Sequence, residues 1–211
     1  MRLLEDVWPS AKWSNIIHIQ LGHLHPVADE TADLTASIAH SGLWNNNGLG
    51  HARSEFEVVI SSAMGGELYL ASRAENNTLS VHDTIVFDTA TDNPSYYVDP
   101  YADDGRDVSG FVIAGVSQGF YLPQTARDPD AVEALQVWYA REKMEGGVSV
   151  GGWEKRLLFE DDGRRIRSAS AAVLVPVERV EGDGDGSGVK KAWLFVTGFL
   201  SESMIAVLVE L

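Results

Sequence analysis

The chain contains two short oxygen-rich segments, Asn45-Asn46-Asn47-Gly48 and Asp92-Asn93-Pro94-Ser95. Asn-Gly and Asp-Asn-Pro sequences are typical of tight turns. Asn47 and Asn93 lie 46 residues apart (93 − 47), which is about the length of one four-stranded propeller blade, roughly 40–50 residues. If both turns close the same end of their blades, their amide and carboxylate oxygens converge on one axis, and Ca²⁺ prefers such oxygen donors. The two segments therefore predict a β-propeller with a calcium site.

The rest of the chain is patterned for strands. Short runs of β-branched and aromatic residues, separated by Gly, Asp, Asn and Pro, predict antiparallel strands. These strands are expected over residues 16–21, 35–39, 56–61, 67–72, 78–88, 110–116, 135–141, 153–158, 169–177, 192–197 and 204–209. Weak helical patterns occur only at 2–12 and 128–134, the second with Pro129 at its first turn. The predicted fold class is all-β, a partial β-propeller of about three to four blades.

One domain is expected to cover residues 1–211, with a flexible acidic, Gly-rich insertion at about 180–191. The sequence Glu181-Gly182-Asp183-Gly184-Asp185-Gly186 has no apolar side chain to bury, so it predicts a mobile hairpin tip. The aspartates at 99, 103, 104 and 107 predict a second solvated loop.

Composition excludes several classes of function. Acidic residues outnumber basic ones 31 to 16, and the resulting net charge of −15 disfavours a nucleic-acid partner. No apolar run approaches the ~20 residues that span a bilayer, and acids interrupt the first residues, which predicts a soluble chain without a signal peptide. The chain has no cysteine, which excludes a disulfide, a thiolate nucleophile and a zinc-thiolate site.

The order of features from Asn45 onward resembles the C-terminal half of the serum paraoxonase/arylesterase family, particularly its fungal members. The segment Asn46-Asn47-Gly48-Leu49 is similar to the family's Asn-Gly turn, and 66–71 is similar to the strand that follows it. The segment Asp92-Asn93-Pro94-Ser95 looks like the family's Asp-Asn calcium turn, and 206–211 like its closing strand.

The resemblance implies a six-bladed β-propeller with calcium in its central tunnel, and a hydrolase that acts on a small-molecule ester or lactone. It assigns Asn47, Asp92 and Asn93 as calcium ligands. The family's other ligands, and the histidine usually proposed as proton acceptor, belong to an upstream half that is expected to lie outside this chain. The family's closing cysteine aligns with Val209, so its disulfide is not expected here.

Each of these assignments has a structural alternative. Both oxygen-rich segments are also ordinary turn sequences. His51, four residues after Asn47, is the only histidine considered as a catalytic group, and a structural or solvent-facing role is its alternative. No serine lies in a Gly-x-Ser-x-Gly elbow, which argues against a serine nucleophile. The alternative function is a noncatalytic propeller fragment, or a binding or scaffold protein, completed by association through its open sheet edges.

Overall fold

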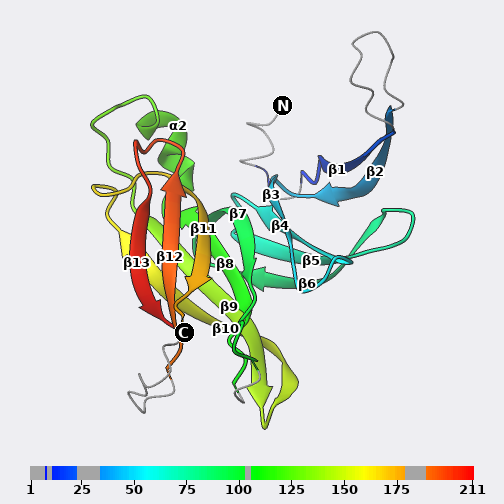
Figure 1. Ribbon diagram of the computed structural model, residues 1–211. Helices are drawn as coiled ribbons and strands as arrows, with labels where there is room; N and C mark the ends of the chain where they lie inside the picture. The colour runs from blue at the N-terminus through cyan, green and yellow to red at the C-terminus, as the bar shows by residue number, and fades with distance from the viewer. Residues whose placement is uncertain (1–7, 9–10, 23–33, 103–105, 179–188) are drawn as a thin grey trace.

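The computed structural model describes residues 8, 11–22, 34–102, 106–178 and 189–211, and strands dominate them (Figure 1). The all-β prediction is confirmed. Within these residues the helical segments are η2 (Gly119–Tyr121) and α2 (Leu122–Thr125). No helix of the described part of the chain is long and apolar enough to cross a membrane.

The strands form one hairpin sheet and two larger sheets. The hairpin pairs β1 (Ser14–Leu21) with β2 (Leu34–Leu43). A four-stranded sheet follows in chain order, with β3 (Asn46–His51), β4 (Glu57–Ser62), β5 (Glu67–Arg73) and β6 (Leu79–Val86). All its neighbours are antiparallel, so it is a simple up-and-down meander.

The seven-stranded sheet consists of two further meanders. The first contains β7 (Ala90–Tyr97), β8 (Gly110–Val116), β9 (Leu135–Glu145) and β10 (Val148–Asp161). The second contains β11 (Ala169–Pro176), β12 (Lys191–Gly198) and β13 (Ile205–Glu210). A single parallel residue pair, Ala171 with Asn93, joins them through β11 and β7. The described structure is therefore a series of three antiparallel meanders, preceded by the hairpin.

The core lies on both faces of the middle meander. Every residue of β8 is buried. Phe111 and Ile113 pack on the β3–β6 sheet, and Val112 and Ala114 pack toward β11–β13, because alternate side chains of a strand point to opposite faces. A third cluster joins β1–β2 to the outer side of the β3–β6 sheet, where Ile16 meets Ile60.

The two tight turns predicted at the oxygen-rich segments are not formed. All eleven expected strands are present, but residues 46–48 of the first segment also lie in a strand, β3, and residues 92–95, the second segment, lie in β7. Each interrupts its ladder with a register shift, between Asn46 and Leu49 and between Thr91 and Pro94. A proline that cannot donate to the ladder is tolerated at such an irregularity. The positive φ that the turn would need occurs one residue earlier, at Asn45 (φ 49).

The helix predictions also need correction. Residues 128–134 are not helical; the described helical turn comes before them, at α2, which has Pro123 near its start. Within this segment Glu133 is buried and accepts a hydrogen bond from the Ser168 hydroxyl. Most of the predicted helix at 2–12 lies outside the described residues.

Two predicted solvated loops contain a buried ion pair. Lys190 Nζ donates to Asp99 Oδ2 at 2.6 Å and to the Tyr101 carbonyl at 2.6 Å. Burial opposes the charged form of Asp99, but hydrogen bonds from Lys190 and from the Tyr101 and Val108 amides outweigh it and lower the pKa of the carboxyl. Asp99 and Lys190 are therefore structural, although the predictions placed both in solvent; residues 180–188 of the insertion lie outside the described residues.

Replacing Lys190 by Met should destabilise the protein by about 3–5 kcal/mol, because Asp99 would be left as a buried charge without its cation. Chemical denaturation of the purified variant measures this loss. Lys143→Met is the control: Lys143 is an exposed lysine of β9, so its replacement should change stability by about 0.5 kcal/mol or less. Equal losses in the two variants would contradict the role of the buried pair.

Candidate functional site

The first strands of the three meanders lie side by side. β7 pairs with β11 through Asn93 and Ala171, and Ser95 Oγ donates to the Ala172 carbonyl at 2.7 Å. β3 approaches β7 so closely that a Cβ on Gly48 would lie 2.8 Å from the Asn93 Cα. Glycine at position 48 is what permits this approach, since any side chain there would collide with β7. The polar residues near the starts of these strands are thereby brought together.

The resulting cluster contains Asn47, Asp92, Asn93 and Ser170. Asn47 Nδ2 donates to Asp92 Oδ1 at 2.7 Å. Asn93 Nδ2 donates to Ser170 Oγ at 3.0 Å and to the Ser170 carbonyl at 3.1 Å. The structure therefore joins all three residues that the resemblance assigned as ligands. It adds Ser170, which is the second residue of β11, as Asn47 is the second residue of β3.

Asp92 carries the only charge of this cluster. Burial raises the pKa of the Asp92 carboxyl, and hydrogen bonds from Ser170 and Asn47 offset only part of that effect. Both of these partners are neutral. The ionised carboxylate therefore costs folding free energy here, and a bound cation would supply the opposite charge that its neighbours lack.

The donor chemistry of the cluster fits a hard cation. The described residues contain no group of three His, Asp or Glu side chains that could hold a metal ion, so this cluster would bind a cation chiefly through amide and hydroxyl oxygens. One carboxylate, two amides and one hydroxyl provide part of the roughly 6–8 oxygens that Ca²⁺ takes. The Nδ2 atoms of Asn47 and Asn93 point toward Asp92 and Ser170. For their Oδ1 atoms to bind calcium instead, both side-chain amides would have to rotate by about 180°.

His51 lies apart from this cluster. It is the last residue of β3, four positions after Asn47, or about 13 Å along an extended strand. It is exposed and lines a shallow surface hollow together with Ile17, His18 and Leu49. The structure does not bring the imidazole of His51 to the cluster.

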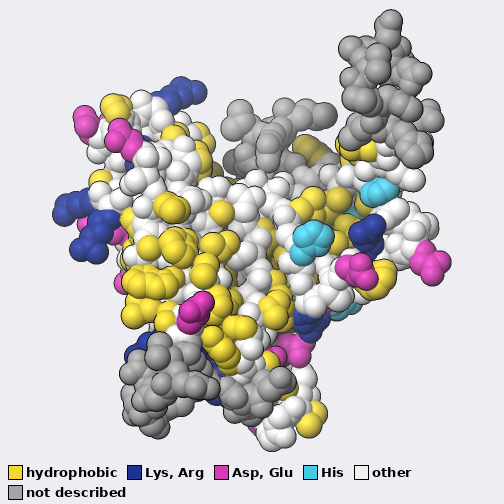
Figure 2. All heavy atoms as spheres, in the orientation of Figure 1, with side chains coloured by type: hydrophobic (Ala, Val, Ile, Leu, Met, Phe, Trp, Pro, Cys, Tyr) yellow, Lys and Arg dark blue, Asp and Glu magenta, His cyan; other side chains and the backbone are white. Residues whose placement is uncertain are grey.

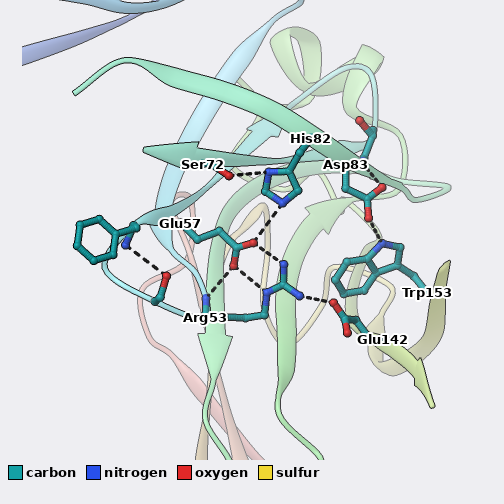
Figure 3. A network of polar contacts seen from close by, with 10 residues as sticks. Arg53, Glu57, Ser72, His82, Asp83, Glu142 and Trp153 are labelled. Atoms are coloured by element: carbon teal, nitrogen blue, oxygen red, sulfur yellow. Dashed lines mark hydrogen bonds and ion pairs between the residues drawn. The ribbon is translucent and has the colours of Figure 1, made fainter. Parts of the chain in front are cut away.

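A second polar network connects the first two meanders (Figure 3). Arg53 Nε donates to Glu57 Oε2 at 2.8 Å, and its Nη1 donates to Glu142 of β9. His82 Nε2 lies 3.3 Å from Glu57 Oε1, and its Nδ1 lies 3.3 Å from Ser72 Oγ. Sequence analysis missed this network because it assembles residues from β4, β5, β6 and β9.

His82 lies between Ser72 and Glu57 in space, as the histidine of a hydrolase triad lies between its serine and its carboxylate. The charges around Glu57, however, are those of a structural network. A triad carboxylate stabilises the imidazolium that forms when histidine takes the serine proton. Glu57 is instead bound through both oxygens by Arg53, which neutralises its charge. The hydrogen bonds from Arg53 are the main reason that the pKa of Glu57 is lowered. We interpret the network as a link between meanders.

Comparison with models of known protein families gives no match to the chain, and comparison with curated proteins gives none either.

Asp92→Asn should make the protein more stable in the presence of a chelator at pH 7. The raised folded-state pKa means that the wild type loses stability as the pH rises above the ordinary value of 3.8 and through the folded value. The asparagine variant does not titrate, so its advantage should appear over that window and vanish in more acidic solution. Thermal unfolding of both proteins from pH 3 to 8 measures the difference; a variant less stable than wild type at pH 7 would contradict the unmatched charge.

Glu57→Gln should cost about 1–3 kcal/mol at pH 7, because Arg53 would lose its charged partner. Since the pKa of Glu57 is lowered from 4.5, the wild-type advantage should be complete above that value and fall as the pH drops through the folded value. Glu142→Gln, which alters the more exposed partner of the same Arg53, should cost about 0–1 kcal/mol. Urea titrations at pH 7 and pH 3 measure both; a pH-independent loss for Glu57→Gln would argue against the charged contact.

Proposed function

We propose that this chain is part of a calcium-binding β-propeller hydrolase that acts on lactones or aryl esters. The observation that carries the proposal is the convergence of Asn47, Asp92, Asn93 and Ser170 from the first strands of three successive meanders. The substrate class rests on the sequence resemblance to the paraoxonase/arylesterase family.

The arrangement of meanders supports the propeller. Propeller blades are four-stranded antiparallel sheets whose first strands surround a central channel. β3–β6 and β7–β10 each have four strands in chain order, and β11–β13 has three. The parallel pair between β7 and β11 is what two neighbouring first strands produce when they run in the same direction along a channel. On this interpretation the chain supplies three blades, and the hairpin β1–β2 belongs to a fourth.

The cluster would hold the ion through Asp92 and the turned amides of Asn47 and Asn93, with Ser170 as a neutral donor. A bound Ca²⁺ would polarise the carbonyl of the ester or lactone and stabilise the oxyanion that forms on it. With one carboxylate among neutral ligands, this part of the shell leaves the ion strongly electrophilic. Proton transfer needs a further group, because His51 lies at the far end of β3.

A noncatalytic binding protein is the second candidate. The side chains of the cluster hydrogen bond to one another, and the imidazoles of His40 and His82 make their contacts elsewhere, with the Leu79 carbonyl and with Ser72 and Glu57. A cation or a polar ligand could then bind at the channel without being followed by hydrolysis.

Calcium addition distinguishes the cation site from a purely structural cluster. We expect millimolar Ca²⁺ to raise the melting temperature of the wild-type chain by a few degrees, because a ligand that binds only the folded state stabilises it in proportion to RT ln(1 + [L]/Kd). Asn47→Ala and Asp92→Asn should abolish the increase. Asp83→Asn, which changes an exposed aspartate of β6 bound to Trp153, is the control and should retain it.

Hydrolysis of a lactone or aryl ester by the isolated chain should be very low, because Asp92 would be held as a ligand of the ion and the cluster has no second carboxylate or imidazole to accept a proton. Turnover that is abolished by chelator and by Asn47→Ala would show instead that the site is complete in this chain. Absence of any calcium-dependent stabilisation would remove the basis of the proposal.

A further inference from the structure

Both ends of the series of meanders present an apolar sheet face. In Figure 1 the sheets follow one another from β13 at one side to the β1–β2 hairpin at the other. We call the outward surface of the last meander the C-terminal face; it consists of Val173, Val175, Trp193, Phe195, Ala206 and Leu208. We call the outward surface of the hairpin the N-terminal face; it consists of Ile17, Ile19, Leu21, Leu34, Ala36 and Ile38.

The C-terminal face follows from strand pairing. Trp193 lies opposite Val175 on one side and Leu208 on the other, so these three side chains form one row across the sheet. Their exposed fractions are 42%, 44% and 49%, and Figure 2 shows apolar side chains gathered over β11, β12 and β13. The opposite side of this sheet already packs in the core through Leu194. An antiparallel sheet with one solvated face normally alternates apolar with polar residues, and this sheet is apolar on both sides.

The N-terminal face has the same character. Ile17 pairs with Ile38, and Leu21 pairs with Leu34. All four side chains are 55–60% exposed, while Ile16 packs on the β3–β6 sheet. The pairing thus places one side of the hairpin in the core and leaves the other side apolar and uncovered.

We propose that two copies of this chain associate head to tail, with the C-terminal face of each copy packed on the N-terminal face of the other, to close a two-fold ring. In this ring the contact between a C-terminal face and an N-terminal face occurs twice, related by the two-fold axis. All four exposed faces of the two copies are then covered. Head-to-tail contacts produce a closed ring when the rotation between copies returns to the start. The twelve face residues carry no charge, and the next row on the same side of β12 and β13 is Lys191 opposite Glu210, one charge of each sign at the edge of the C-terminal face.

The area available suits a stable dimer. Nine large side chains that are about half exposed contribute on the order of 80–100 Å² each, so two contacts bury on the order of 1,600 Å², the usual size of a specific interface. The ring also bears on the calcium site, and this part of the inference rests on the proposed function. Four side-chain donors per copy are too few for a full calcium shell, whereas two copies around one channel supply up to eight.

Sedimentation equilibrium of the purified chain at micromolar concentration, in chelator and in millimolar Ca²⁺, tests the ring. We expect twice the chain mass of 23.0 kDa. Trp193→Asp and Ile38→Lys should each give monomers, since each places a charge in both contacts. Val148→Asp, at an apolar position of β10 that is 66% exposed, is the control and should remain dimeric. Unchanged circular dichroism and melting of the monomeric variants excludes misfolding as the cause.

Mixing the two monomeric variants provides the decisive measurement. The Trp193→Asp copy keeps its N-terminal face and the Ile38→Lys copy keeps its C-terminal face, so an equimolar mixture should recover dimers through one intact contact, more weakly than wild type. A dimer broken by Trp193→Asp but not by Ile38→Lys would mean that C-terminal faces pair with each other, and would overturn the head-to-tail ring. A monomeric wild type, which would leave these faces to a partner of another sequence, or open-ended oligomers would overturn it as well. A dimer that forms equally in chelator and shows no response to calcium would support the ring and contradict the calcium site.

Discussion

Burial of both faces of β8 is the constraint on which the rest of the structure depends. Its residues alternate between two cores, with Phe111 and Ile113 on one side and Val112 and Ala114 on the other. A strand that is apolar on both faces needs a sheet against each of them. The meanders on either side meet this need, and their stacking brings β3 and β11 against β7. The polar cluster at Asn93 is therefore a consequence of apolar packing rather than of attraction among its own members.

Two sets of ion pairs connect the stacked meanders in addition to their apolar contacts. Arg53 bridges Glu57 on the first meander and Glu142 on the second, and Lys190 at the entry to β12 reaches Asp99, which follows β7. Their energetic weights differ because their exposure differs. Lys190 and Asp99 are almost fully buried, and each neutralises the charge of the other. Arg53 and Glu142 are partly exposed to water, which screens their attraction.

The stacking of the meanders also connects the candidate site with the uncovered faces. Each inner meander is covered by the next, but the outward surfaces of β1–β2 and β11–β13 have no such cover among the described residues, as Trp193 and Ile38 illustrate. In the proposed propeller, the three first strands border only part of the channel, so the donors around Asp92 would form one part of the cation shell.

Strand positions could be predicted from the sequence, since a run such as 110–116 is apolar and β-branched whatever surrounds it. The failures occurred where tertiary packing overrides local preference. The segments around Asn47 and Asn93 contain turn residues, yet they are strands, because close contact between β3 and β7 stabilises an irregular ladder. Asp99 and Lys190 read as loop charges, and only their long-range pairing explains their burial.

The sequence by itself determined the all-β class and which residues carry oxygen donors near Asn47 and Asp92, because propensity and side-chain chemistry are local properties. Tertiary structure alone decided that these donors meet, that Ser170 joins them and that His51 does not. The reason is that such distances depend on how sheets stack and which residues pair, as Ala171 with Asn93 does across 78 positions (171 − 93). Local pattern predicts a strand, but only its neighbours decide what its side chains face.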